Sequence, residues 1–197
     1  MSSYSASNKR NPAVRLPEVL NAQEQETLLS APNKKAPTGL RNYCMLLVFL
    51  NTGLRVSEAL NLKVDDIDWK TGKLFVRAGK GNRDRILWLK DDDLVLLASW
   101  LKIRPAASEY LFSTLKGGRM NDRYVRDFVK RYGLKKKIIK DVHPHTLRHS
   151  FATDLLRNTN NIRLVQKALG HVSISTTMIY THIVDEQLEL ALKGFRD

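Results

Sequence analysis

An unbroken apolar run at residues 43–50 constrains the fold more than any other feature of the sequence. It lies within residues 40–52, a segment that is apolar on nearly every side when it is drawn as a helix. A helix without a polar face has to be surrounded by protein, so this segment is predicted to be the central helix of the fold. The run is far shorter than the ~20 apolar residues of a membrane-spanning helix, which predicts a soluble protein with no membrane partner.

The only cysteine of the chain, Cys44, lies inside this run. A single cysteine cannot form an internal disulfide, and its apolar neighbours predict that the thiol is packed in the core. The polar residues 1–11 lack the apolar stretch of a secretory signal. Together these features predict a protein of the reducing cytoplasm.

Hydrophobic periodicity and turn residues predict an α+β fold that is mainly α-helical, with one small antiparallel β-hairpin. Residues 1–12 show no apolar period and are expected to be a flexible tail or the stump of a linker. Gly133 and Gly170 are each expected to end a helix, and Ser175 is expected to cap the helix that carries Tyr180. The other expected helices cover residues 22–30, 40–52, 56–62, 91–103, 121–132, 144–157, 162–169 and 185–193, and the strands cover residues 73–77 and 83–89.

Basic side chains outnumber acidic ones, because 33 Lys and Arg stand against 20 Asp and Glu, for a formal charge of +13. This excess favours a polyanionic partner, and nucleic acid is the first candidate, because neutralising phosphates releases condensed counterions. The alternative is a basic surface that only keeps the protein in solution. The basic residues 135–140 are open to the same two interpretations, contact with nucleic acid or a solvated surface.

Three short motifs carry candidate chemistry: Thr-Gly-Leu-Arg-Val-Ser-Glu at residues 52–58, His-Thr-Leu-Arg-His at 145–149, and Leu-Gly-His at 169–171, followed nine residues later by Tyr180. In this order and spacing they resemble the tyrosine recombinases, the phage-integrase family, and most of all its Xer-like and integron-integrase-like members. The resemblance extends from about Leu16 to Val184. It implies the catalytic-domain fold of that family.

Two arginines of these motifs, Arg55 and Arg148, suit a clamp on a phosphodiester. A guanidinium is always charged and its planar fork matches phosphate oxygens, so two of them stabilise the charge that gathers there during attack. The alternative is that each arginine pairs with a local carboxylate, Glu58 or Asp154.

The resemblance makes Tyr180 the nucleophile and His145 the group that assists removal of its proton. His145 and Arg148 are three residues apart on an expected helix, so their side chains share a face. A free tyrosine titrates near ~10, so a base and two cations favour the phenolate. The alternatives are a structural role for His145 and an interface aromatic at Tyr180. His149 is expected on a different face, with a packing or supporting role.

The resemblance also assigns Lys80, at the tip of the hairpin, the role of protonating the leaving 5′ oxygen. Its flanking glycines let the backbone approach DNA closely. Hairpin lysines are commonly only solvent-facing, and Lys73, Arg83 and Arg85 compete for the role. His171 is expected to donate a hydrogen bond to a phosphate oxygen, with a helix C-terminal cap as its alternative role.

The implied reaction is attack by Tyr180 on DNA, a 3′-phosphotyrosyl link, and rejoining by a 5′-hydroxyl of a partner strand. It needs no metal, no cofactor and no ATP. The implied partners are double-stranded DNA and further copies of the chain in a tetramer on DNA, with accessory proteins left open. The apolar side of the expected helix 185–193 is assigned either to a neighbouring copy or to the core of its own chain.

Most members of the family carry an N-terminal helical domain that closes a clamp on DNA. Residues 13–197 are expected to form the catalytic domain, with that core-binding domain absent. The length of 197 residues agrees with one compact domain.

Other classes of protein remain open. A non-catalytic DNA-binding regulator needs only the charge and the helices, but it leaves the three motifs unexplained. A type IB topoisomerase shares the chemistry and rotates DNA instead of exchanging partners. A zinc hydrolase is least supported, because the segment between His145 and His149 lacks the Glu of a zinc-protease helix.

Overall fold

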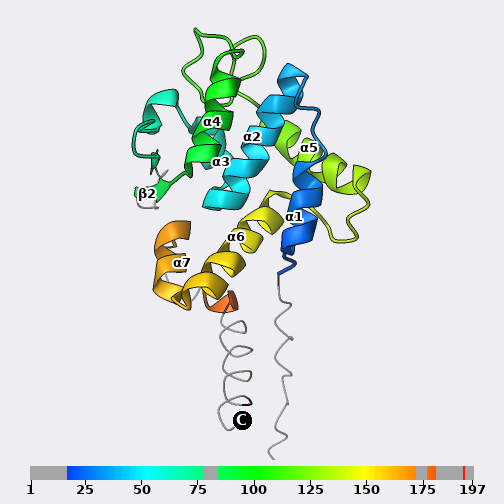
Figure 1. Cartoon of the computed structure of the whole chain (residues 1–197), viewed down its shortest axis with the longest axis vertical. Coiled ribbons are helices and arrows are strands. Elements are labelled where there is room, and N and C mark those ends of the chain that lie inside the picture. The colour runs from blue at the N-terminus through cyan, green and yellow to red at the C-terminus, as the bar shows by residue number, and fades with distance from the viewer. Residues whose placement is uncertain (1–16, 78–83, 172–176, 181–192, 194–197) are drawn as a thin grey trace, which may run out of the picture.

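The computed structural model describes residues 17–77, 84–171, 177–180 and 193, and within these residues the fold is mainly helical with one small sheet (Figure 1). The predicted fold class is therefore confirmed. The elements are, in chain order, α1 Ala22–Leu29, α2 Pro37–Thr52, α3 Val56–Asn61, η1 Val64–Asp66, β1 Lys73–Val76, β2 Arg85–Trp88, α4 Asp91–Leu101, α5 Asp122–Lys135, α6 Pro144–Thr159, α7 Ile162–Leu169 and η3 Met178–Tyr180.

Helix α2 is the centre of the fold, as its apolar sequence predicts. It packs against α1, α4 and α6, which surround it in Figure 1. Its buried side chains include Cys44, Met45 and Phe49, each fully buried. The helix begins three residues before the expected start because Pro37, which has no backbone N–H to lose, suits a first turn.

The β-hairpin forms at the expected place and pairs antiparallel, with Leu74 opposite Leu87 and Phe75 opposite Ile86. Because successive side chains of a strand point to opposite faces, Leu74 and Leu87 enter the core while Phe75 and Ile86 remain exposed. The expected turn residues, including Lys80, lie outside the described residues.

The prediction that α5 ends at Gly133 is wrong, because the helix continues to Lys135. A Cβ on residue 133 would lie 2.7 Å from Cβ of Val142. The glycine therefore serves close packing between α5 and the segment that leads into α6, and not chain reversal.

Helices α6 and α7 form a second apolar cluster beside the main core. Ala152 and Leu156 of α6 pack with Val165 and Leu169 of α7, and Tyr180 belongs to the same cluster. Helix α7 ends at Gly170, whose φ of 64° is the expected left-handed C-cap. Of the expected helix around Tyr180, the described residues form the short 3₁₀ turn η3. The expected cap Ser175 lies outside the described residues, as do residues 1–12 and 185–192.

No helix within the described ranges is both long enough and apolar enough to cross a lipid bilayer.

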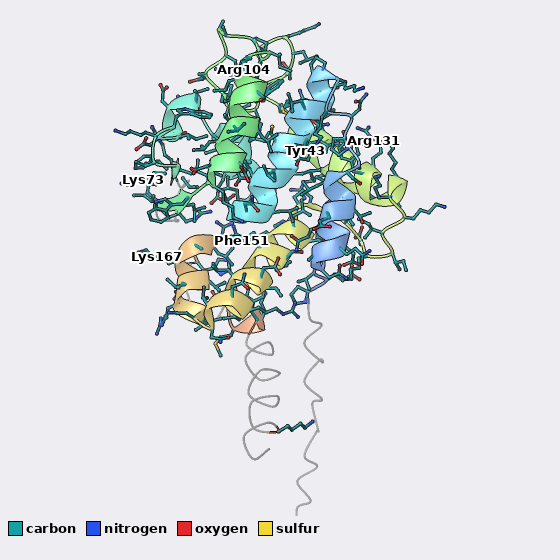
Figure 2. All side chains as sticks on the ribbon, viewed as in Figure 1. Tyr43, Lys73, Arg104, Arg131, Phe151 and Lys167 are labelled. Carbon is teal, nitrogen blue, oxygen red and sulfur yellow. The ribbon has the colours of Figure 1, made fainter. Side chains whose placement is uncertain are left out.

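Gly53 joins the two apolar clusters and is expected to be intolerant of a side chain. It caps α2 with a φ of 61°, and a Cβ there would lie 2.3 Å from Cδ1 of Phe151, the α6 residue at the junction with α2 (Figure 2). Gly53→Ala is expected to lower the free energy of unfolding by at least ~1 kcal/mol in urea denaturation, from the positive φ alone. Gly118→Ala is the matched control, because its Cβ would meet only Thr114 Oγ1 at 3.6 Å. Equal losses in the two variants would contradict the role given to Gly53.

Candidate active site

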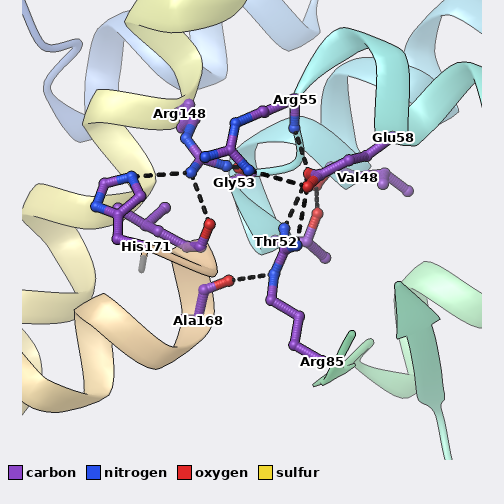
Figure 3. Close-up of polar contacts among 10 residues, drawn as sticks. Val48, Thr52, Gly53, Arg55, Glu58, Arg85, Arg148, Ala168 and His171 are labelled. Carbon is purple, nitrogen blue, oxygen red and sulfur yellow. Dashed lines mark hydrogen bonds and ion pairs between the residues drawn. The ribbon is translucent and has the colours of Figure 1, made fainter. Parts of the chain in front are cut away.

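Five of the six predicted site residues come together from distant parts of the chain, and His145, on α6 with Arg148, is one of them because the charges of Arg148 and Arg55 act on it. Arg55 caps the N-terminus of α3, Arg148 lies on α6, His171 follows the end of α7 and Tyr180 lies in η3. Figure 3 shows Arg55, Arg148 and His171 converging between α3, α6 and α7. The packing of α6 against α2 and α7 brings these residues into one place.

Arg148 is the most constrained cation of the site. It is only 5% exposed, and its guanidinium donates hydrogen bonds to the Gly53 carbonyl at 2.5 Å and the Leu169 carbonyl at 2.7 Å. Burial, followed by the positive charge of Arg55, lowers the pKa of Arg148 to about 10. The guanidinium remains charged at neutral pH, but in a position where positive charge is costly.

Arg55 pairs with Glu58, one of the two carboxylates that the sequence offered as alternative partners, and its role in a phosphate clamp stays a prediction. The Glu58 carboxylate accepts from the Arg55 backbone N–H at 2.8 Å and from its guanidinium at 3.1 Å. Arg85 donates to the same carboxylate through both terminal nitrogens at 2.9 Å. Burial alone would raise the pKa of Glu58, but the hydrogen bonds and charge of Arg85 outweigh it and keep the pKa below its ordinary value. The Arg55 side chain is nevertheless 36% exposed, so it reaches the surface.

The hydrogen bonds of His171 fix its protonation. Its Nε2 lies 3.1 Å from a terminal nitrogen of Arg148, and its Nδ1 lies 2.9 Å from Oγ1 of Thr177. Arginine can only donate, so Nε2 accepts and the ring proton sits on Nδ1. Burial and the charge of Arg148 lower the pKa of His171 to about 4, so the ring is neutral at pH 7.

Tyr180 is buried with its hydroxyl against a histidine. The residue is 1% exposed, and the hydroxyl lies 2.5 Å from Nδ1 of His149. Burial raises the pKa of Tyr180 to about 12, although the charge of Arg148 acts in the opposite direction. Burial and the charge of His145 lower the pKa of His149 to about 4. Both partners are therefore neutral in this arrangement at pH 7.

His149 is the residue whose partner the sequence did not identify. It is expected to have a packing or supporting role, and in the structure its ring packs on Tyr180 and its Nδ1 contacts the Tyr180 hydroxyl. The side chain that shares a helix face with Arg148, His145, is exposed, and its ring packs edge-on to His143 with centroids 6.1 Å apart. Partial burial of this ring, followed by the charges of His143 and Arg126, lowers the pKa of His145.

The remaining candidates are the basic residues of the hairpin and Asp154. Lys80 and Arg83 lie outside the described residues, while Lys73 is exposed on β1. Arg85 is buried in its ion pair with Glu58, so it is not free to protonate a leaving oxygen. Asp154, considered as a partner of Arg148, accepts a hydrogen bond from Gln25 instead.

Within the described residues, no three His, Cys, Asp or Glu side chains are grouped closely enough to bind a metal ion. The chemical groups that the site brings together are two guanidiniums, neutral imidazoles and a phenol. This composition suits an anion with several oxygens, such as a phosphodiester.

The fold and the site together define a mainly helical domain in which a tyrosine lies beside a cluster of arginine and histidine side chains. Residues 18–187 match the Phage integrase family, and the chain belongs to this family. The predicted membership is confirmed.

Curated relatives include the tyrosine recombinase XerD of Staphylococcus epidermidis, which is 40% identical over 181 residues, covering 88% of this chain and 61% of the relative. XerD of Staphylococcus aureus is 39% identical over 188 residues, covering 92% of this chain and 63% of the relative. The chain thus spans about three fifths of the length of the curated relatives that it matches.

Several solved structures have a fold similar to that of this chain. XerA recombinase superposes with a TM-score of 0.79 at 35% identity, covering 93% of this chain and 66% of the other. XerH site-specific recombinase, in a post-cleavage complex with a palindromic difH substrate, gives a TM-score of 0.79 at 32% identity, covering 93% of this chain and 54% of the other. The catalytic domain of bacteriophage HP1 integrase shares the fold, with a TM-score of 0.62 at 23% identity, covering 90% of this chain and 95% of the other.

The two buried imidazoles predict how stability changes with pH. His149 and His171 keep a pKa of about 4 in the folded chain, against 6.5 in a free side chain. Between these values the unfolded chain binds protons that the folded chain does not, so the free energy of unfolding is expected to be constant above pH ~6.5 and to fall as the pH falls toward ~4. Urea denaturation across this range measures the slope. In His149→Asn the slope is expected to be shallower, and an unchanged slope would contradict the assignment.

Proposed function

We propose that this chain is the catalytic part of a site-specific DNA recombinase, which cleaves and rejoins DNA through a 3′-phosphotyrosyl intermediate. The observation that carries the proposal is the proximity of two like charges at a buried site. Arg55 is near enough to Arg148 to lower its pKa, and Arg148 is 5% exposed. Two cations held together in a poorly solvated place cost free energy, and an anion bound between them relieves that cost.

The anion is proposed to be the scissile phosphate of double-stranded DNA. Helix α5 contributes the exposed cations Arg123, Arg126 and Lys130, of which Arg123 and Arg126 pair with Asp127 and Asp122 of the same helix. The charge of Arg126 still acts on His145. These exposed side chains can exchange their carboxylate partners for the phosphates of a DNA backbone. The XerH relative is described in complex with its DNA substrate, which supports the same partner for this chain.

Tyr180 is the proposed nucleophile. Its hydroxyl gives up a proton, with His145 as the proposed assistant, while the charge of Arg148 favours the phenolate. The buried position against His149 keeps the oxygen from any external phosphate, so attack requires Tyr180 to leave this hydrogen bond.

The proposed step is a balanced exchange at phosphorus. The Tyr180 oxygen forms a bond to phosphorus, the bond to the 5′ oxygen breaks, and that oxygen leaves with a proton supplied by Lys80. Arg55 and Arg148 stabilise the charge on the non-bridging oxygens. His171 is proposed to join them once its ring proton is on Nε2, which ends the hydrogen bond that Nε2 accepts from Arg148. The 5′-hydroxyl of a partner strand then reverses the step. One phosphoester bond forms as another breaks, so the energy of the bond is kept in the link to Tyr180 and no ATP is needed. The two guanidiniums stabilise the non-bridging oxygens, so the step needs no metal ion.

The assembly and the location are part of the same proposal. Exchange between two duplexes passes through a four-way junction, which four copies of the chain would hold, and accessory proteins are further candidate partners. The proposed location is the cytoplasm, where the DNA of a bacterium lies.

Tyr180→Phe is expected to abolish the covalent adduct, because it removes the one oxygen that attacks phosphorus. The substrate is a pool of nicked duplexes with randomised arms. After cleavage, the short strand that carries the leaving 5′-hydroxyl ends at the nick and dissociates, so the covalent adduct cannot revert and accumulates. Adducts are separated on a denaturing gel, and their DNA is sequenced to identify the preferred duplex. DNA binding in a mobility-shift assay is expected to remain within about twofold of wild type, because phosphate contacts dominate affinity.

Tyr110→Phe, at a half-buried tyrosine outside the site, is the matched control and is expected to keep adduct formation. An adduct that persists in Tyr180→Phe moves the nucleophile elsewhere. Relaxation of supercoiled DNA without recombinant products would favour a topoisomerase, and binding without any adduct in the wild type would favour a regulator.

Lys80→Ala is expected to slow cleavage of the preferred duplex strongly and to be rescued when sulfur replaces the bridging 5′ oxygen. A thiolate leaves without a proton, so the substitution removes the need for the acid. Single-turnover adduct formation on the two substrates measures the rescue. Lys73→Ala, at an exposed lysine of the same hairpin, is the control and is expected to behave as wild type. Equal rescue of Arg55→Ala would remove the support for Lys80 as the acid.

A further inference from the structure

Arg85 is the most thoroughly bonded arginine next to the site, and the mechanism above leaves it without a role. It is the first residue of β2, and its side chain is only 4% exposed. Its Nε donates to the Ala168 carbonyl at 2.7 Å, and its two terminal nitrogens donate to the two carboxylate oxygens of Glu58, each at 2.9 Å (Figure 3). All three nitrogens of one guanidinium are thus engaged with two different helices.

Glu58 connects Arg85 to Arg55, because its carboxylate accepts hydrogen bonds from both. The two parallel hydrogen bonds from Arg85 fix both the position and the plane of the carboxylate. The same carboxylate oxygens accept from the backbone N–H and the guanidinium of Arg55. Arg55 is 36% exposed at its side chain, so without a fixed acceptor its guanidinium would sample several rotamers.

The third hydrogen bond of Arg85, from its Nε, connects it to the other side of the site. Ala168 lies in the last turn of α7, next to Leu169, whose carbonyl accepts from Arg148, and three residues before His171. One guanidinium therefore sets the distance between the helix that presents Arg55 and the helix end that supports Arg148 and His171 (Figure 3).

We propose that Arg85 is a positioning residue for DNA cleavage, which acts through Glu58 to hold Arg55 against the non-bridging oxygens of the scissile phosphate. The proposal rests on the recombinase function proposed above. A buried ion pair is weak evidence for stability, because desolvation offsets much of the attraction between its charges. The three-way geometry, and not the strength of the pair, gives Arg85 its role.

The test compares two substrates, and cleavage of one of them depends less on Arg55. In a methylphosphonate, a methyl group replaces one non-bridging oxygen, so less negative charge develops at phosphorus and the clamp is less important. The preferred nicked duplex recovered with the wild-type chain is made with a phosphate or a methylphosphonate at the scissile position. Single-turnover adduct formation is measured for wild type, Arg55→Ala, Arg85→Gln and Arg85→Lys.

Both Arg85 variants are expected to form the phosphate adduct about 10- to 100-fold more slowly than wild type, the range seen when a group that orients a functional side chain is lost. The methylphosphonate is expected to recover most of that loss, as it does for Arg55→Ala. Substitution of sulfur for the bridging 5′ oxygen is expected to recover none of it. Adding Arg85→Lys to Arg55→Ala is expected to change the rate less than about twofold, because residues that act through one another are not additive.

Arg85→Lys protects the test against loss of folding, because the lysine keeps a positive charge beside Glu58 but cannot make the paired hydrogen bonds. Arg77→Gln is the matched control, since Arg77 lies on the same hairpin and pairs with the buried Asp66. Among the described hydrogen bonds and ion pairs, it has none with Glu58, Arg55 or Arg148. It is expected to cleave both substrates as wild type does.

Three results would overturn the proposal: wild-type rates in a folded Arg85→Lys, a loss that the methylphosphonate leaves unchanged, or a loss that adds fully to that of Arg55→Ala. Rescue by the bridging sulfur would instead assign Arg85 to the leaving group, and so overturn the route through Arg55. Different results would overturn the proposed recombinase function: no adduct with the wild-type chain, or an adduct with Tyr180→Phe.

Discussion

The fold and the site depend on the same interaction, the buried Arg148 guanidinium. It ties the carbonyl at the end of α2 to the carbonyl at the end of α7, and it contacts His171 as well. These carbonyls lie at helix ends that leave backbone oxygens without helical partners, so an arginine between them satisfies both ends at once. The left-handed turn at Gly53 gives one of these oxygens its direction, which is why a backbone constraint and a charge constraint coincide at this point.

The cost of this arrangement explains the residues around it. Placing Arg55 beside a buried Arg148 is unfavourable for both charges, and the pKa of Arg148 is lowered as a result. Glu58 offsets part of the cost by binding Arg55 and Arg85 together while its own pKa stays low. A carboxylate between the arginines would neutralise the clamp, but Glu58 contacts Arg55 from the side of α3 and leaves over a third of that side chain exposed. The site therefore keeps a positive charge where an incoming anion can meet it.

The sequence predicts elements better than it predicts contacts. The apolar run of α2 and the Gly170 cap of α7 are local patterns, and the structure contains both. The convergence of Arg55, Arg148, His171 and Tyr180 was expected only from the resemblance to a family, since no spacing along the chain brings α3 to α6. Gly133 was misread because a glycine that allows close packing is indistinguishable in sequence from one that ends a helix. The contacts of Arg85 with Glu58 and of His149 with Tyr180 join residues 27 and 31 positions apart, beyond any local pattern.

The burial of Tyr180 separates the state described here from the reacting state. The ring belongs to the apolar cluster of α6 and α7, and its hydroxyl is held by His149. Burial of an aromatic side chain contributes on the order of 1.5–3 kcal/mol, and a hydrogen bond adds about 1 kcal/mol. Release of the nucleophile therefore costs a few kcal/mol, which contacts with bound DNA have to offset. Because the burial that hides the hydroxyl also raises its pKa, one movement of Tyr180 toward Arg55 and Arg148 would both expose the oxygen and favour its deprotonation. A nucleophile held in this way is reactive only where the phosphate is already bound.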